Sequence, residues 1–364
     1  MAEVKTNRPP ADAFRQQKLK AWQPILTPFK VIIIFIAVGV SFIPTGIFLL
    51  GASNAIYENT MTYDGSSSNV DCSITKANQG KSCQITFNID KDFSGPLYVY
   101  YEMSNFYQNH RRYVNSKDST QLAGTQISSE TTLATSCITS YKNGSQIINP
   151  CGLIANSFFN DVIYLTSNKS TPSSISLDES DISWPSDSSK FKQVEGFKSA
   201  IVHNSSVSCA AAGLPNGCKY YHDPSSGTSY RYFYPSESSY QYLYESYPNQ
   251  ISPIDGVTDE HFKVWMRTAA LPTFRKLYGK ISGNFKNGNK LVFTVICNFE
   301  VSSFDGSKAI VISTLGEFGG KNPYLGVAYI VVGTVSLMFA LLFLSKQIIS
   351  PRMVADPSLL NWNL

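Results

Sequence analysis

The chain has 364 residues and a formal net charge of +4, and charged residues make up only 15% of it. The N-terminal arm before residue 31 accounts for the whole excess, because it carries six basic and two acidic residues. This mild balance excludes a strongly basic nucleic-acid surface. It leaves the arm as a signal for membrane topology with a weak attraction to anionic lipid.

Two uncharged apolar runs of 22 residues each, at 31–52 and 324–345, lie near the ends of the chain. A helix of that length is about 33 Å long, close to the hydrocarbon thickness of a bilayer. We therefore predict two transmembrane helices that separate an N-terminal arm (1–30), a central block (53–323) and a C-terminal tail (346–364).

The flanks of these runs predict the orientation. Basic residues outnumber acidic ones in both terminal segments, which favours cytosolic termini and a central block on the lumenal or extracellular side. The first run starts too late and is too long for a cleaved secretory signal, so we expect it to remain as an anchor.

Glycines recur at intervals of seven in both apolar runs, as Gly39 and Gly46 in the first and Gly326 and Gly333 in the second. Seven residues are close to two helical turns, so each pair lies on one face and lets a neighbouring backbone approach. The two faces could pack against each other or against a further membrane partner, and the sequence leaves both possibilities open. Pro44 predicts a kink in the first helix.

All seven cysteines lie in the central block, which fits an oxidising compartment. Six cysteines allow 15 pairings, and the simplest prediction joins the close neighbours: Cys72 with Cys83, Cys137 with Cys151, and Cys209 with Cys218. Cys297 lies in the apolar run 291–299 and is expected to be a free, buried thiol. The spacing C-x₂-C is absent and histidine is scarce, so we predict neither a metal site nor another cofactor.

Three N-x-S/T sequons, at Asn143, Asn168 and Asn204, lie in polar, loop-like stretches of the same block. On the lumenal side such sites accept glycans, and we expect at least one of them to be glycosylated.

The central block is predicted to be rich in β-strands. Alternating or apolar stretches predict strands at 83–89, 97–101 and 162–166, and alternating tyrosines at 230–234 and 240–244 predict strands or a loop with one tyrosine face. That face is more typical of packing than of ligand binding.

Further elements are expected on both sides of these strands. Residues 104–113 are typical of a short capped helix or tight turn, and 259–270 of a helix capped by Asp259 and ended by Pro272. Strands at 291–299 and 309–315 flank Asp305-Gly306, which indicates a hairpin. We predict an antiparallel, sandwich-like fold with a few short helices.

The short motifs that carry catalysis are missing. The sequence contains no G-x-S-x-G, G-x₄-G-K-[ST], G-x-G-x-x-G or H-E-x-x-H, and no aspartyl-phosphate D-K-T-G. His110, Arg111 and Arg112 could form an anion site, but a structural turn or a partner contact is the favoured interpretation. The apolar runs hold no ionisable residue, which argues against an ion path. We expect a protein that is not an enzyme.

Trp22, Pro24 and Ile25 belong to a basic, glutamine-rich stretch just before the first apolar run. The stretch could be an interfacial segment with Trp22 at headgroup level. It could equally be a docking element for a cytosolic or membrane partner, and the residues do not separate these interpretations.

Six stretches resemble one known family: FRQQKLKAWQPILT (14–27), IPTGI (43–47), SNFYQNHRRYVNSKDSTQL (104–122), PCGLIANSFFND (150–161), FKVWMRTAALPTFRKLYGKI (262–281) and GGKNPYLGVAYIVVG (319–333). They resemble the cell division control protein 50 family, also called the ligand-effect-modulator family. Its members are accessory β-subunits of type IV P-type ATPases, the phospholipid flippases. The resemblance runs from about residue 14 to 345 and is weak at 167–250. Val162 stands where family members often complete a sequon.

The resemblance implies a two-pass membrane protein with a glycosylated, disulfide-braced ectodomain, paired with a ten-helix ATPase. That ATPase carries the aspartyl phosphate and moves phospholipid to the cytosolic leaflet. The β-subunit is needed for folding, exit from the endoplasmic reticulum and activity. The resemblance places it in the endoplasmic reticulum, Golgi or endosomes and plasma membrane, in contact with membrane lipids. Residues then expected at the partner interface are Trp22, Pro24, Ile25, Gly39, Gly46, Asn105, Tyr107, Arg111, Arg112, Gly326 and Gly333.

Two other classes remain open. One is a receptor or adhesion ectodomain that works without an ATPase. The other is a small oligomeric channel or transporter, against which the uncharged membrane helices argue.

Overall fold

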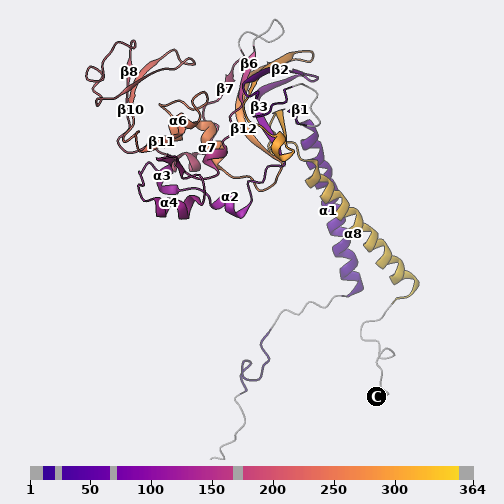
Figure 1. Cartoon of the computed structure of the whole chain (residues 1–364). Coiled ribbons are helices and arrows are strands. Elements are labelled where there is room, and N and C mark those ends of the chain that lie inside the picture. Colours follow the sequence, from indigo (N-terminus) through magenta and orange to yellow (C-terminus); the bar gives the residue numbers. More distant parts are fainter. Residues whose placement is uncertain (1–10, 21–26, 66–71, 167–174, 352–364) are drawn as a thin grey trace, which may run out of the picture. The chain divides into compact units, whose positions relative to one another are not determined.

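The computed structural model describes residues 11–20, 27–65, 72–166 and 175–351. The chain divides into two compact units (Figure 1). The helical unit comprises the chain up to Ala55 and from Asn322 onward, and the β-rich unit comprises Ile56–Lys321. Two terminal helices flanking an antiparallel β-rich block confirm the predicted fold class.

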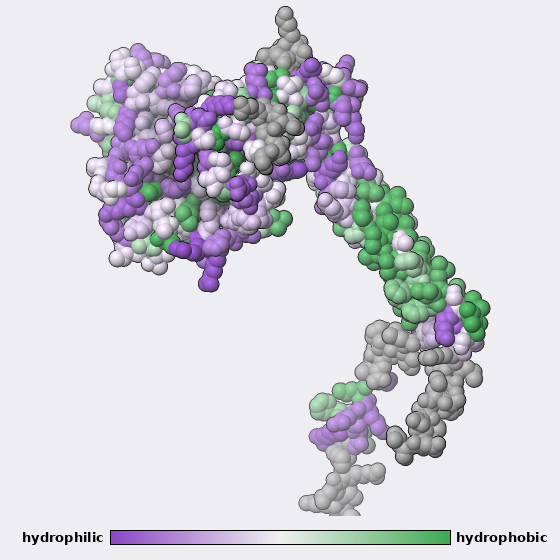
Figure 2. Space-filling view, turned by 45° about the vertical axis from the view of Figure 1, so that its right-hand side comes forward, coloured by the Kyte–Doolittle hydropathy of each residue, from purple (hydrophilic) through white to green (hydrophobic). Residues whose placement is uncertain are grey.

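The helical unit consists of α1 (Pro28–Ala55) and α8 (Pro323–Ile349). Both are long and apolar enough to cross a membrane, and hydrophobic residues cover most of the visible face of the pair (Figure 2). α8 begins cleanly because Pro323 occupies its first turn and the Asn322 side chain accepts a hydrogen bond from the Tyr324 N–H.

α1 and α8 pack against each other through their glycines. Gly39 and Gly46 are buried on α1, and Gly326 and Gly333 on α8. A Cβ at Gly46 would lie 2.8 Å from the Gly326 carbonyl oxygen, so only glycine permits this approach. The glycine faces meet within the chain, which is one of the two arrangements that the sequence left open. A contact of these four residues with a membrane partner stays a prediction.

Two antiparallel sheets form the centre of the β-rich unit. The larger has the order β1-β14-β3-β12-β7 and the smaller β2-β13-β6. The strands are β1 (Glu58–Asp64), β2 (Lys81–Asn88), β3 (Phe93–Ser104), β6 (Val162–Thr166), β7 (Leu177–Asp178), β12 (Phe274–Phe285), β13 (Lys290–Cys297) and β14 (Ser307–Ser313). Inward-facing residues of both sheets, such as Ile85, Leu97, Phe293 and Ile310, join one buried core cluster.

Two smaller sheets complete the unit, with the orders β8-β10-β9 and β11-β5-β4. Their strands are β4 (Lys142–Asn143), β5 (Gln146–Asn149), β8 (Lys198–Val202), β9 (Lys219–His222), β10 (Ser229–Phe233) and β11 (Tyr240–Tyr242). β11 pairs with β5 in parallel. The short helices are α2 (Arg111–Asn115), α3 (Ser119–Leu122), α4 (Glu130–Cys137), α5 (Pro185–Ser188), α6 (Leu243–Ser246) and α7 (Glu260–Met266). Three 3₁₀ turns lie at Ala155–Ser157, Gly256–Thr258 and Ser302–Phe304.

The predicted hairpin around Asp305-Gly306 is wrong. β13 pairs with β2 and β6, whereas β14 pairs with β1 and β3, so the chain changes sheets between them. The backbone N–H groups of Asn298 and Phe299 donate to Asp161 and turn the chain away from β13. Both are interior strands with a neighbour on each side, and each takes these neighbours from elsewhere in the chain.

The helix predicted at 259–270 begins as expected and ends early. The Asp259 carboxylate caps α7 by accepting from the Phe262 N–H at 2.8 Å. α7 ends at Met266 because the Lys276 ammonium donates to the carbonyls of Val264, Trp265 and Arg267 and replaces the next helical turn.

The tyrosine-rich stretch forms β10, β11 and α6, where the prediction had strands or a loop. Its rings pack on one another inside the unit: Tyr234 lies 4.5 Å from Tyr242 and 4.9 Å from Tyr244 between ring centroids. The tyrosine face therefore serves packing, as its pattern indicated.

Candidate partner-binding surface

The three disulfides are those between close neighbours. Cys72–Cys83, Cys137–Cys151 and Cys209–Cys218 span 11, 14 and 9 residues. Each closes a short loop of the unfolded chain and so reduces its entropy.

Cys297 is a free, buried thiol. Its sulfur lies 4.0 Å from that of Cys83, and burial raises the pKa of the thiol to about 12. The sulfurs of Cys72, Cys83 and Cys297 cluster within 4.8 Å. Two of the three are joined in a disulfide, so the cluster does not offer three thiolates to a metal ion.

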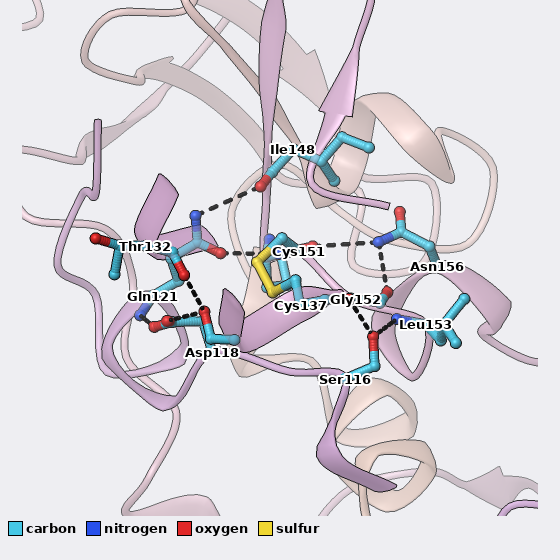
Figure 3. Close-up of a disulfide and its surroundings, with 12 residues drawn as sticks. Ser116, Asp118, Gln121, Thr132, Cys137, Ile148, Cys151, Gly152, Leu153 and Asn156 are labelled. Carbon is cyan, nitrogen blue, oxygen red and sulfur yellow. Dashed lines mark hydrogen bonds between the residues drawn. A yellow bond between two sulfur atoms is a disulfide. The ribbon is translucent and has the colours of Figure 1, made fainter. Parts of the chain in front are cut away.

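The Cys137–Cys151 bridge is embedded in hydrogen bonds from three segments (Figure 3). The Cys151 N–H donates to the Gln121 side chain at 2.8 Å, and Ser116 Oγ accepts from the Leu153 N–H at 2.9 Å while donating to the Cys137 carbonyl. Gly152 has φ +107°, and a Cβ there would overlap the Ser116 carbonyl oxygen. Only glycine fits at this position, which explains why Gly152 follows Cys151 in the stretch PCGLIAN.

Three of the stretches that resemble the family meet in space. The Gln108 side chain accepts from the Ala269 N–H at 2.9 Å, and Phe106 N–H donates to the Pro272 carbonyl at 3.1 Å. Trp265 is fully buried and donates to the Ile154 carbonyl at 2.8 Å. Residues 104–113, 150–157 and 262–272 thus form one junction, which we call the motif junction.

The outer side of the motif junction presents an aromatic ring and two arginines. Tyr107 is 56% exposed, and Arg111 and Arg112 are exposed at the start of α2. Neither guanidinium forms an ion pair with a described residue. The side chain of Leu271 is also exposed, at 67%. Buried neighbours hold the backbone still, so these exposed groups stand on a rigid support suited to a protein contact.

Asn105 has a structural position within this surface. It adopts φ +58°, a left-handed conformation that asparagine tolerates, and its side chain donates to the Phe304 carbonyl at 2.6 Å. Its amide nitrogen is therefore engaged within the chain, and the residue shapes the turn that carries Tyr107.

A buried ion pair that the sequence did not predict lies next to the segment 298–306, where the chain passes from β13 to β14. Lys308 is fully buried, and its ammonium contacts Asp161 at 2.6 Å, the Phe299 carbonyl at 2.6 Å and Asp64 at 3.3 Å. Asp161 also accepts from the Tyr63 hydroxyl at 2.7 Å. Asp161 ends the stretch PCGLIANSFFND, but nothing local in the sequence pairs it with Lys308.

A cavity with a volume of about 560 Å³ lies on the outer face of β3 and β12. Tyr98, Tyr100 and Trp184 give it an apolar lining, and Arg267 stacks over Trp184 at 4.8 Å. Arg275 is engaged by Glu58 and Glu102. No histidine or cysteine is among its described lining residues.

The other predicted site residues are the three before the first apolar run and the three sequon asparagines, and the structure describes only some of them. Trp22, Pro24, Ile25 and Asn168 lie outside the described residues. Asn143 is exposed, and its amide donates to Gln241 at 2.8 Å. Asn204 is exposed in a turn whose Ser206 hydroxyl donates to the Asn204 side chain at 2.6 Å.

Comparison with known proteins identifies the family. The model of the LEM3 (ligand-effect modulator 3) family / CDC50 family matches residues 49–353. The chain belongs to the CDC50 family. The motif junction and α8 lie within the matched region, whereas most of α1 precedes it.

Named relatives of the CDC50 family match along nearly the whole chain. Cell cycle control protein 50A of Mus musculus is 36% identical over 353 residues, covering 94% of this chain and 89% of that protein. The putative ALA-interacting subunit 4 of Arabidopsis thaliana is 36% identical over 96% of this chain and 93% of its own length. The phospholipid-transporting ATPase accessory subunit CRF1 of Saccharomyces cerevisiae is 31% identical over 98% and 90%. With its two apolar helices, this CDC50 family chain is a membrane protein.

Proposed function

We propose that the chain is the accessory β-subunit of a type IV P-type ATPase that moves phospholipid from the outer or lumenal leaflet to the cytosolic leaflet. The observation that carries the proposal is the match along nearly the whole chain to a protein named as a phospholipid-transporting ATPase accessory subunit. The chain itself is non-catalytic in this proposal, and the partner hydrolyses ATP and moves the lipid.

The topology proposed for this subunit follows the charge bias. Both termini lie in the cytosol and the β-rich unit lies on the lumenal or extracellular side. The three disulfides and the exposed sequons at Asn143 and Asn204 support that side, since both modifications belong to the secretory route. The chain travels with its ATPase from the endoplasmic reticulum through the Golgi or endosomes to the plasma membrane.

Partner contact is proposed in three layers. Trp22, Pro24 and Ile25 act at the cytosolic interface, the outward face of α1 acts in the membrane, and Tyr107, Arg111 and Arg112 act on the lumenal side. Each contact raises the effective concentration of the others, so the assembled complex is far tighter than any one layer. The guanidinium groups of Arg111 and Arg112, which form no ion pair with a described residue, suit an acidic outer loop of the ATPase.

Co-expression tests the proposal. The purified chain alone should show no ATPase activity, whereas together with a cognate type IV ATPase it should co-purify and restore lipid-stimulated turnover. A matched variant, Arg111→Ser with Arg112→Ser, should bind less well, while Lys286→Ser, an exposed lysine outside the motif junction, should bind normally.

The alternative is a receptor or adhesion ectodomain that works without an ATPase. Equal lipid-stimulated turnover with and without the chain, in membranes and in detergent, would contradict the subunit proposal and favour that alternative.

A further inference from the structure

One backbone carbonyl in the middle of α1 cannot find its usual donor within the helix. Pro44 lies inside α1 (Pro28–Ala55). Proline has no N–H to give to the carbonyl four residues earlier, which is that of Val40, and its ring pushes this carbonyl outward. Val40 is 63% exposed.

The nearby hydroxyls do not compensate for the missing N–H. In membrane helices Ser and Thr side chains often satisfy a carbonyl freed by proline. Here Ser41 Oγ donates to the Val38 carbonyl at 3.1 Å, and Thr45 Oγ1 donates to the Ser41 carbonyl at 2.8 Å. Both protons are used, so the hydroxyl oxygens remain as acceptors only.

Val40, Ser41, Pro44 and Thr45 lie together on one exposed face of α1, which we call the Pro44 notch. At 100° per residue this face is centred about 180° from Gly39 and Gly46, which α8 covers. The notch is therefore directed away from α8. It presents three acceptors, the Val40 carbonyl and two hydroxyl oxygens, and none of their protons is free.

The depth of the notch determines what can bind there. Val40 is the thirteenth of the 28 residues of α1, so it lies roughly 18 Å along the helix axis, within the hydrocarbon layer. Lipid tails and a water-free bilayer core offer no hydrogen-bond donor, and an unpaired carbonyl there is unfavourable. The notch needs a protein donor.

The donor should be a primary amide. A side-chain amide brings two N–H groups to two neighbouring acceptors, which matches a carbonyl flanked by hydroxyl oxygens. The apolar runs 31–52 and 324–345 contain no Asn, Gln or Trp, so another copy of this chain has no amide to offer from these spans. A membrane helix of a different polypeptide must supply it.

We propose that the Pro44 notch is the intramembrane docking site for the ATPase subunit, and that an Asn or Gln side chain on one of its membrane helices donates to the Val40 carbonyl. The inference rests on the proposed function and adds the chemistry of recognition within the membrane. Ala37, exposed one turn before Ser41, lets the partner backbone come close enough for a short side chain to reach.

Three substitutions test the notch in the full-length chain, with co-purification and the apparent dissociation constant from the ATPase as readouts. Pro44→Ala restores the missing N–H and should weaken association roughly 3- to 30-fold, because the carbonyl no longer needs the partner. Thr45→Val removes one hydrogen-bond acceptor from the notch and should also weaken association with the ATPase. Thr334→Val is the matched control: Thr334 on α8 makes the same kind of bond to the Ile330 carbonyl at 2.7 Å, and its loss should leave association unchanged.

The outcomes separate this inference from the proposed function. If the unsubstituted chain binds the ATPase and both Pro44→Ala and Thr45→Val bind it with the same affinity, the proposed role of the notch is overturned. The subunit role would still stand. Failure of the wild-type chain to co-purify would instead overturn the proposed function. If Pro44→Ala alters the fold, as read from its disulfides and glycans, the Thr45→Val and Thr334→Val pair decides: equal binding rejects the notch, and selective loss at Thr45 supports it.

Discussion

Lys276 and Lys308 are buried in the β-rich unit, and each is held by a different set of acceptors. Lys276 has no carboxylate partner among the residues that the structure describes. Burial lowers its pKa to about 7, and its ammonium is directed at three carbonyls at the end of α7. Lys308 instead faces the carboxylates of Asp161 and Asp64. A buried ammonium needs acceptors of this kind, so both lysines fix the positions of segments far apart in sequence.

Replacing Lys308 by methionine should destabilise the protein by about 3–5 kcal/mol, since Asp161 and Asp64 would remain buried without their counter-charge. Thermal or urea unfolding of the purified full chain measures this, with the fully buried Trp265 as fluorescence reporter. Lys280→Met is the control, because Lys280 pairs with Asp178 near the surface at 3.4 Å. Losing this pair should lower the free energy of unfolding by under about 1 kcal/mol. If Lys308→Met and Lys280→Met destabilise the protein equally, Lys308 is not structurally important.

At the scale of elements, the contact between α1 and α8 depends on glycine. A Cβ at Gly333 would lie 2.7 Å from Ile43 Cγ1 and 3.2 Å from the Ile43 backbone nitrogen. The pair is further packed by rings, among them Phe42 and Tyr329 with centroids 5.0 Å apart. Close approach in a bilayer depends on packing because lipid competes equally well for apolar side chains.

Gly333→Leu should therefore separate α1 from α8 while leaving the β-rich unit folded. Cysteines placed at Phe42 and Tyr329 can be joined with a short bifunctional reagent, and the yield should fall several-fold in the Gly333→Leu background. Val332→Leu, at an exposed neighbour, should keep the yield. An unchanged yield in both would mean that the glycine contact does not hold the helices together.

The short strand β7 is tied to α7 by a titratable pair. His261 Nε2 lies 2.8 Å from a Glu179 oxygen, and the ring packs on Tyr278 with centroids 4.4 Å apart. Burial by itself lowers the pKa of His261, but Glu179 and the Asp259 carboxylate raise it above its ordinary value. A raised pKa in the folded state means that protonation stabilises the contact.

This stabilisation is complete below the unfolded pKa of about 6.5 and is lost as the pH rises through the folded value. We expect amide hydrogen exchange in residues 175–181, corrected for intrinsic rates, to be slower at pH 6 than at pH 8. His261→Gln should remove the difference, whereas His222→Gln on β9 should preserve it. A dependence that survives His261→Gln would assign the effect to another group.

At the scale of the whole molecule, the chain separates its tasks between two units. The helical unit provides membrane anchorage, and the β-rich unit carries all three disulfides and the exposed groups of the motif junction. Stable bridges and a large core make the second unit a rigid support, which suits binding better than turnover.

The proposed topology predicts the outcome of protease treatment. A protease added to sealed microsomes should trim only the terminal segments and leave the β-rich unit intact. Glycosidase should lower the apparent mass, and Asn143→Gln and Asn204→Gln should each remove part of that shift where the site is occupied. Asn160→Gln is the control, because Val162 breaks the sequon pattern there. Digestion of the central block in sealed vesicles would reverse the orientation.

Local features of the sequence determined much of this protein. Two uncharged runs of 22 residues predicted the helices α1 and α8, because such segments are stable only where their apolar surface is covered. A period-two pattern predicted β2, an apolar stretch predicted β6, and the Asp259 cap predicted the start of α7, since these signals act within a few residues. The pairing of close cysteines was the simplest of the 15 that the sequence allowed, and the structure has that pairing.

Tertiary structure decided what depends on residues far apart in the chain. Gly46 and Gly326 are 280 positions apart, and nothing local shows that they cover each other and leave the Pro44 face of α1 free. The turn at Asp305-Gly306 has hairpin residues, yet its flanking strands join different sheets because their best partners lie elsewhere. Lys308 and Asp161 form a pair only once two sheets have closed over them. Such contacts reflect the free energy of burying surfaces together, and no stretch of sequence contains that information by itself.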